Sequence, residues 1–239
     1  MVKLSLMRIF LYLPKIGVRR KVVENKQIID NIKNPNKASV NNDKENKNFD
    51  IYNFIKRAID ITCSLIGIIV FLPIFIITAV LIRIESRGNV IFKQLRIGKN
   101  SKPFYIYKFR SMRIDTPNMA TNDMKNPEMY ITKIGKIIRK TSIDELPQLI
   151  NILKGDMSIV GPRPVIEKEV DLINLRKKHK VDTVLPGITG WAQINGRDNL
   201  GIEEKVTYDK EYLDRRSIKF DLYIMVMTVF KVLKRDDIR

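Results

Sequence analysis

The sequence predicts a helix-dominated α+β protein, in which a membrane helix hinged at a proline precedes a compact cytosolic domain with a small β-hairpin and amphipathic helices. Three observations support this prediction. Residues 61–82 carry no charged side chain. Several later segments place apolar residues at helical spacing. One pair of short segments rich in β-forming residues surrounds a turn, which predicts the hairpin.

The composition points to anionic partners. The chain of 239 residues contains 44 Lys and Arg against 26 Asp and Glu, a formal net charge of +18. Such an excess suits nucleic acid, anionic lipid or phosphorylated substrates. Cys63 is the single cysteine, which excludes an internal disulfide and fits a reducing compartment.

Residues 1–50 are predicted to be a basic, largely disordered extension and linker. Arg8 interrupts the first apolar run and no small-residue cleavage site follows, so a secretory signal is not expected. A short amphipathic segment on the membrane surface is the alternative for this start. Residues 34–48 contain only Ala38 and Val40 as apolar residues, too few to order the segment by burial.

Residues 51–86 are predicted to form the membrane helix. A straight helix over residues 61–82 would extend roughly 33 Å, enough to cross a hydrocarbon core of roughly 30 Å. Pro73 lies near its middle, where a proline removes a backbone donor and should break or kink the helix. Both flanks are basic, and the cytosolic side carries the excess of Lys and Arg. We therefore favour a re-entrant helix over a span or a buried core helix.

The remaining residues, 87–239, are predicted to form the cytosolic domain. Residues 90–98 and 103–112 flank the turn-like sequence Lys-Asn-Ser-Lys and are expected to pair as a hairpin. Residues 131–139 suit a short basic helix or turn. Further helices are expected at 146–153, ended by Gly155, at 164–180, opened by Pro164, and at 203–216 and 219–235. The last of these suits either the membrane surface or the core.

The segment Thr141–Leu149, TSIDELPQL, carries adjacent carboxylates. Ser142 and Glu145 have the spacing of a helix capping box. Pro147 would then fall where an intrahelical donor is already required. If Asp144 is the cap instead, Pro147 lies in the first turn, where its missing donor costs nothing. The helix dipole would then keep both carboxylates ionised.

These residue types suit chemistry at phosphorus. An ionised Asp144 can attack a phosphorus atom, and Glu145 beside it can help bind Mg²⁺. Arg139 and Arg163 offer planar guanidinium groups that match phosphate oxygens. From the residues alone, helix capping with surface charge remains the alternative.

Longer motifs identify a family. They are Lys56-Arg57 with Asp60, YKFRSM at residues 107–112, SIDELPQL at 142–149, KGDMSIVGPRP at 154–164 and PGITGWAQINGR at 186–197. In this order they resemble the bacterial sugar transferases, monotopic polyprenol-phosphate hexose-1-phosphate transferases. The resemblance implies a re-entrant helix hinged at Pro73 and a catalytic dyad of Asp144 and Glu145 with Mg²⁺ as cofactor.

The resemblance also implies the substrates and the location. The donor would be a UDP-sugar, the acceptor undecaprenyl phosphate, and the products UMP and a lipid diphosphosugar, formed through a covalent intermediate on Asp144. The reaction would initiate a bacterial exopolysaccharide, capsule, O-antigen or glycoprotein glycan, at the cytosolic face of the cytoplasmic membrane. Leu72 stands where the family often has Ser, which leaves the angle of the hinge open.

Further candidates for substrate or phosphate binding are Lys108 and Arg110 in the hairpin, Arg197 after a glycine-rich turn, and Asp209 as an accessory acid. The alternatives are exposed strand cations for the first pair and a surface ion pair for Asp209. His179 in a basic run suits a solvated face, and no Cys/His cluster supports a zinc site.

Two other functional classes are alternatives. A membrane-tethered nucleic-acid-binding protein suits the charge, but it leaves the dyad unexplained, and no nucleic-acid partner is expected. A non-catalytic scaffold of a glycan assembly complex would not need an intact dyad. Membrane lipids are expected partners, and a homo-oligomer is left open.

Overall fold

The computed structural model describes residues 35–116, 127–196 and 199–234, with only the backbone for residues 35–49, 233 and 234. The chain divides into two compact units at residues 53 and 54. The second unit therefore includes most of the predicted membrane helix together with the predicted cytosolic domain. Residues 1–34 of the predicted extension lie outside the described residues.

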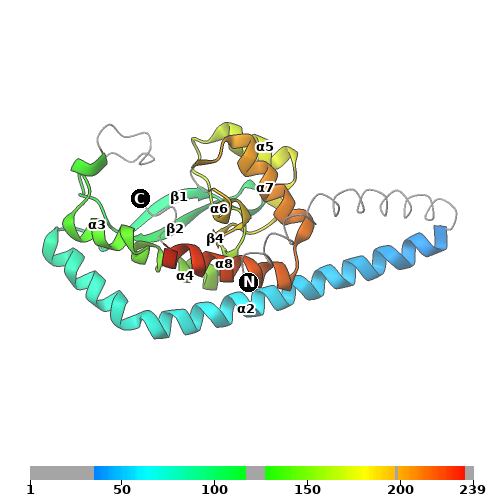
Figure 1. Cartoon of the computed structure of the whole chain (residues 1–239), viewed down its shortest axis with the longest axis horizontal. Helices are drawn as coiled ribbons and strands as arrows, with labels where there is room; N and C mark the ends of the chain where they lie inside the picture. Colours follow the sequence, from blue (N-terminus) through cyan, green and yellow to red (C-terminus); the bar gives the residue numbers. More distant parts are fainter. Residues whose placement is uncertain (1–34, 117–126, 197–198, 235–239) are drawn as a thin grey trace, which may run out of the picture. The chain divides into compact units, whose positions relative to one another are not determined.

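A single long helix, α2 (Pro35–Glu85), contains the whole apolar segment. It begins within the predicted linker, whose backbone is helical from Pro35. A helix already nucleated in the apolar segment extends by one hydrogen bond per added residue. The helix does not break at Pro73; it curves along the second unit instead (Figure 1).

Residues 50–85 are long and apolar enough to cross a membrane by length and composition. Most apolar side chains between residues 65 and 84 are exposed, including those of Ile69, Val70 and Ile77. The opposite face is buried: Ile82 packs with Phe109 and Ile138, and Phe75 meets Phe109 edge-on at 5.4 Å between ring centroids. One face of α2 thus belongs to the core of the second unit.

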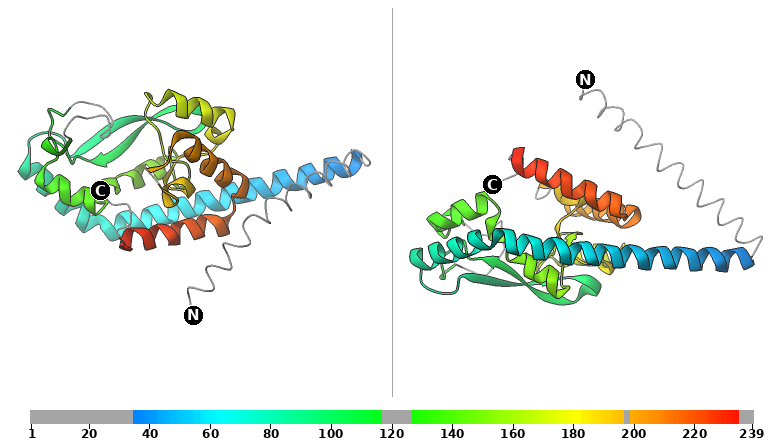
Figure 2. Two further views of the ribbon diagram at one scale, coloured as in Figure 1. Left: turned by 45° about the horizontal axis from the view of Figure 1, so that its top comes forward. Right: turned by 90° about the horizontal axis from the view of Figure 1, so that it is seen from below.

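The predicted hairpin is confirmed. Strands β1 (Ile91–Ile97) and β2 (Pro103–Phe109) pair antiparallel, with Ile91 opposite Phe109 and Ile97 opposite Pro103. A 3₁₀ turn, η1 (Lys99–Ser101), connects them, with Asn100 and Ser101 at positive φ. In all the views α4 (Gln148–Lys154) lies between this hairpin and α2 (Figure 2).

The other elements follow the hairpin in chain order. They are η3 (Pro127–Met129), α3 (Lys133–Lys140), η4 (Ile143–Glu145), α4, β3 (Ser158–Val160), α5 (Val170–Lys178), η5 (Val181–Thr183), β4 (Gly187–Thr189), α6 (Trp191–Ile194), α7 (Ile202–Arg215) and α8 (Ile218–Lys234). The predicted helices are present, and Gly155 ends α4 at φ 89°.

The helix predicted from Pro164 begins later, at Val170. The backbone before it is engaged elsewhere, because Ile97 N donates to Val165 O over 2.8 Å and Ile166 N donates to the Glu169 carboxylate. The structure also contains a short parallel pair, β3 with β4, that the sequence analysis does not predict.

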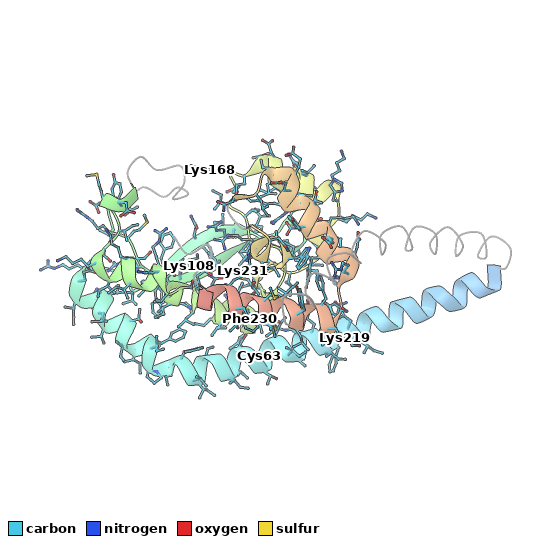
Figure 3. All side chains as sticks on the ribbon, viewed as in Figure 1. Cys63, Lys108, Lys168, Lys219, Phe230 and Lys231 are labelled. Carbon is cyan, nitrogen blue, oxygen red and sulfur yellow. The ribbon has the colours of Figure 1, made fainter. Side chains whose placement is uncertain are left out.

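The last helix, α8, carries apolar side chains on both its buried and its exposed face. Phe220 and Ile224 are buried in a cluster with Val160, Ile194 and Tyr212. Its opposite face exposes apolar side chains, among them Val226, Val229 and Phe230, the last labelled in Figure 3. The core interpretation is confirmed for the buried face, and the membrane-surface interpretation stays a prediction for the exposed face.

Candidate active site

The two carboxylates of the dyad lie in the 3₁₀ turn η4, between α3 and α4. Ile143 and Leu146 flank them, and both pack against the cluster of Ile82, Phe109 and Ile138. These apolar side chains anchor the turn on both sides. Asp144 and Glu145 are thereby presented together on a turn fixed against the core.

The capping-box interpretation is wrong. Ser142 makes no side-chain capping hydrogen bond and lies in the left-handed region at φ 56°. The alternative cap is not found either, because α4 begins at Gln148 with Pro147 as its N-cap. The dyad precedes the helix by a turn, so capping does not explain this acidic pair.

Lys108 contacts the dyad, and its predicted role in substrate or phosphate binding stays a prediction. Its Nζ lies 2.8 Å from Glu145 Oε1, and both side chains are largely buried. Lys108 is labelled in Figure 3, on β2. An ion pair in this partly buried position is screened less than one at the surface.

Asp144 is half-buried, and its pKa is raised to about 6. The largest cause is burial of the carboxyl group, followed by the charge of Glu145, while Lys108 and Arg139 lower the pKa. The expectation that a helix N-terminus stabilises the ionised form of Asp144 is therefore wrong, because α4 begins only at Gln148 and burial raises the pKa of the carboxyl group. Desolvation disfavours the charged form of a carboxyl group, and perturbed carboxyl groups of this kind are typical of functional sites.

Arg139, near the end of α3, is close enough to lower the pKa of Asp144. Its helix is fixed at the other end by two caps. Thr132 Oγ1 accepts from Gly135 N, and the Glu85 carboxylate accepts from Lys133 N at 2.6 Å and Ile134 N at 3.0 Å. The end of α2 thus sets the position of α3, a role of Glu85 that the sequence analysis misses.

Asn151 on α4 positions the hairpin at the dyad. Its side chain pairs with the β2 backbone, accepting from Tyr107 N at 3.0 Å and donating to Tyr105 O at 2.7 Å. The residue is completely buried. The Asn151 amide thus makes the hydrogen bonds that a neighbouring strand would make with β2. Because Lys108 follows Tyr107 on this strand, these bonds help to fix the position in which Lys108 contacts Glu145. The place of Asn151 after the dyad on the same predicted helix is the only sequence signal for this role.

Arg163 lies in a loop that close backbone packing holds in place. Gly161 N donates to Thr189 O and Gly187 N donates to Pro162 O, both at 2.9 Å. A Cβ atom on Gly187 would lie 2.1 Å from Gly161 N. Gly161 and Gly187 are therefore required where the segments 154–164 and 186–197 meet.

Asp209 does not lie free as an accessory acid. Its carboxylate accepts from Arg176 Nε at 2.9 Å and Nη2 at 2.6 Å, and Arg176 Nη1 donates to Arg163 O at 2.7 Å. Both side chains are nearly inaccessible to solvent. In the described part of the chain, the hydrogen bonds of this pair reach the loop of Arg163 through the Arg163 carbonyl group.

Arg110 is buried, and its guanidinium donates to Ser86 O, Ser86 Oγ and Arg87 O. These contacts join β2 to the end of α2 and favour a structural role. It is not the exposed strand cation of the alternative either. Arg197 lies outside the described residues, so its predicted role in phosphate binding stays a prediction.

Trp191 packs within the domain. Its ring lies 5.1 Å from that of Phe220 between centroids, and its Nε1 donates to Glu211. Among the described residues, no group of three or more His, Cys, Asp or Glu side chains is placed to bind a metal ion. Asp144 and Glu145 are adjacent carboxylates, a donor set that suits the protein's part of a magnesium site completed by water and substrate phosphates.

Comparison with known proteins gives a family match. The sequence model of the family described as "Bacterial sugar transferase" matches residues 51–235. The "Uncharacterized sugar transferase EpsL" of Bacillus subtilis is 42% identical over 185 residues, covering 77% of this chain and 90% of that protein.

Two longer relatives have more specific names. The "UDP-N-acetylgalactosamine-undecaprenyl-phosphate N-acetylgalactosaminephosphotransferase" of Aeromonas hydrophila is 41% identical over 189 residues, covering 77% of this chain and 44% of that protein. The "UDP-glucose:undecaprenyl-phosphate glucose-1-phosphate transferase" of Escherichia coli is 41% identical over 187 residues, covering 74% of this chain and 40% of that protein. The chain therefore spans less than half the length of these two relatives.

Proposed function

The chain belongs to the bacterial sugar transferase family, and we propose that it transfers a sugar 1-phosphate from a UDP-sugar to undecaprenyl phosphate. UMP is released and a lipid diphosphosugar is formed. The names of two relatives pair a UDP-sugar with undecaprenyl phosphate, which supports both substrates. The observation that carries the proposal is the dyad of Asp144 and Glu145 on its anchored turn, with Lys108 and Arg139 beside it.

In the first step a carboxylate oxygen of Asp144 attacks the phosphorus atom that bears the sugar. The bond from this phosphorus to the bridging oxygen breaks, and UMP leaves with that oxygen. The sugar phosphate remains bound to Asp144 as an acyl phosphate. The raised pKa of Asp144, about 6, leaves the carboxylate mostly ionised at neutral pH and poorly solvated, as a nucleophile requires.

In the second step an oxygen of the lipid phosphate attacks the same phosphorus. The bond to Asp144 breaks, the carboxylate is regenerated and the lipid diphosphosugar is complete. Lys108 orients Glu145 through their ion pair, and Arg139 contributes positive charge next to Asp144. Both cations favour the approach of the anionic substrates to the dyad.

We propose Mg²⁺ as the cofactor, bound by Asp144 and Glu145 together with the donor diphosphate. When bound, it would neutralise phosphate charge and stabilise the leaving group. The adjacent carboxylates support this proposal, because magnesium usually binds proteins through one or two carboxylates and completes its shell with phosphates and water.

We also propose that α2 is re-entrant and that the catalytic residues face the cytosol. Near one end of the apolar segment, Lys56 pairs with Asp221 at 2.9 Å. Beyond its other end, Glu85 caps α3. Both ends of the segment thus contact the same domain, which supports their placement on one side of the membrane.

Topology can be tested by cysteine labelling in a Cys63→Ser background. Asn48→Cys and Asn89→Cys should both resist a membrane-impermeant reagent added to intact cells and react after the cells are opened. Labelling of residue 48 alone from outside would establish a span and reject the re-entrant helix.

The activity is tested by mixing the purified protein in detergent with undecaprenyl phosphate, Mg²⁺ and each of a set of radiolabelled UDP-sugars. We expect one or few sugars to yield UMP and a labelled lipid. Absence of UMP with every sugar would contradict the proposal and favour the scaffold or nucleic-acid interpretations. The product would serve as the first lipid-linked unit of a bacterial surface glycan.

A further inference from the structure

Arg96 lies between the end of β1 and the loop that carries Arg163. Its Nη1 donates to Pro164 O over 3.3 Å, and its Nη2 donates to Gln94 Oε1 over 2.6 Å. The next residue along the strand continues the contact, because Ile97 N donates to Val165 O over 2.8 Å. The end of β1 is thus attached to this loop by side chain and backbone together.

A second arginine contacts the same loop. Arg176, fixed by Asp209, donates to Arg163 O. The carbonyl groups of Arg163 and Pro164 are consecutive in the chain, and each accepts from a different, largely buried guanidinium. This arrangement fixes the backbone of Arg163 while its own side chain makes no hydrogen bond or ion pair within the described part of the chain.

The charges that act on Arg96 include those of Arg163 and of one member of the dyad. Burial, and next the charge of Arg163, lower the pKa of Arg96 to about 10, whereas Glu169 and Glu145 raise it. Arg96 is therefore near both Arg163 and a member of the dyad. The Arg96 Nε–H is buried with no hydrogen-bond partner among the described residues, which is a costly position for a polar group.

Two neighbouring guanidinium groups in a partly buried position destabilise the folded protein, because like charges repel and desolvation penalises both. A bound anion would offset this repulsion, because it attracts both guanidinium groups. The arrangement is understandable if the loop must present Arg163 to an anionic substrate beside Glu145.

We propose that Arg96 is a positioning residue of the donor site: it fixes the Arg163–Pro164 backbone to the end of β1, so that the Arg163 guanidinium meets the donor diphosphate. The inference rests on the proposed function for the identity of the anion. The inference adds Arg96, a residue of the hairpin, to the proposed donor site formed by the dyad and the Arg163 loop.

The test is a double-mutant cycle read out by the equilibrium dissociation constant of UDP. The variants are Arg96→Met, Arg163→Met and the double variant, all of the full-length protein in detergent. Each single substitution should weaken UDP binding about tenfold, the loss typical of a hydrogen bond to a charged group. The double variant should bind UDP about as weakly as either single variant, because without Arg96 the Arg163 side chain is already misplaced.

Lys93→Met is the matched control, because it removes a cation from the same strand at an exposed position. It should leave UDP binding within about twofold of the parent. Gln94→Leu keeps the charge of Arg96 but removes its orienting acceptor, and it should weaken UDP binding by a smaller factor. This variant also provides the cycle with Arg163→Met if Arg96→Met does not fold.

Independent effects would multiply to about a hundredfold loss in the double variant, which would overturn the inference. An unchanged affinity in Arg96→Met, or an equal loss in Lys93→Met, would also overturn it. These outcomes leave the proposed function intact as long as the parent binds UDP. A parent that does not bind UDP would instead overturn the proposed function, and this inference with it.

Discussion

Lys108 Nζ lies 2.8 Å from Glu145 Oε1, so the ion pair connects the hairpin to the carboxylate next to Asp144, the proposed nucleophile. Lys108 also lowers the pKa of Asp144, opposing the burial that raises it to about 6. A strand cation thus influences both members of the dyad. Its removal should affect the pH dependence of the reaction as well as its rate.

Lys108→Met should raise the pKa of Asp144 further above its ordinary value. In the proposed mechanism Asp144 attacks only when ionised, so the acid limb of the rate profile, expected near pH 6 in the parent, should move to higher pH. The variant should lose more activity at pH 6 than at pH 8. UMP release across this pH range measures the shift, with Lys102→Met on the exposed turn as the control. An acid limb that does not move would contradict the role assigned to Lys108.

Asp144→Asn should abolish the release of UMP that precedes addition of the lipid acceptor. In the parent we expect a burst of about one UMP per active site, because the first step needs only donor and Mg²⁺. Glu145→Gln should be severe as well, and Arg163→Lys should weaken donor binding yet leave some turnover. Rapid-quench measurement gives the burst. UMP release by Asp144→Asn near the parent rate would mean that another group or the acceptor attacks.

Asp144→Asn should also change how stability depends on pH. In the parent the folded state binds this proton more tightly than the unfolded state, because the pKa rises from 3.8 to about 6. Stability from this group is therefore present at low pH and lost as pH rises to about 6. The asparagine variant should gain about 2 kcal/mol over the parent at pH 8 relative to pH 4. Thermal unfolding in detergent with EDTA at both pH values measures this difference.

Glu85→Ala should destabilise the protein by about 1 kcal/mol, because two amide groups at the start of α3 lose their acceptor. Activity should fall as well, since α3 carries Arg139 toward Asp144. Glu128→Ala is the control: Glu128 pairs with Lys136 at the surface, where both side chains are mostly exposed, and such pairs contribute little. Equal shifts in melting temperature would argue against the cap.

Pro73→Ala should restore a backbone donor inside α2 and reduce its curvature. Part of the population should then span the membrane, and activity should fall. Protease protection of an N-terminal tag in sealed vesicles reports the topology. If topology and activity stay unchanged, the contacts of Lys56 and Glu85 with the domain impose the bend, and the proline is not its cause.

The elements that local sequence specifies were predicted well. The β-forming residues around Lys99–Lys102 specify the hairpin, and Gly155 specifies the end of α4. The parallel pair of β3 and β4 was missed, because each strand is only three residues long and the pairing depends on close approach between distant glycines. Short strands with little side-chain periodicity leave almost no local signal.

The same contrast between local sequence and tertiary structure applies to the candidate site. The dyad and Lys108 could be chosen from residue type and motif, whereas the raised pKa of Asp144 could not, since the burial that causes it comes from other elements. Arg110 was selected for its charge, yet its guanidinium serves the backbone of Ser86 and Arg87. Asn151 and Glu85 act through backbone groups far away in sequence, which no local pattern reveals.

The two-faced helix α2 also limits how this protein can evolve. In the proposed membrane placement its outer apolar side chains need only suit lipid, so they can vary among Leu, Ile, Val and Phe. Its inner side chains each have a particular partner in the domain. Arg57 donates to Leu153 O, Asp60 accepts from Ile159 N, and Ile82 packs with Phe109 and Ile138. The anchor therefore cannot be exchanged as a module between relatives without rebuilding the core, and a version cut at residue 87 to improve solubility should not fold.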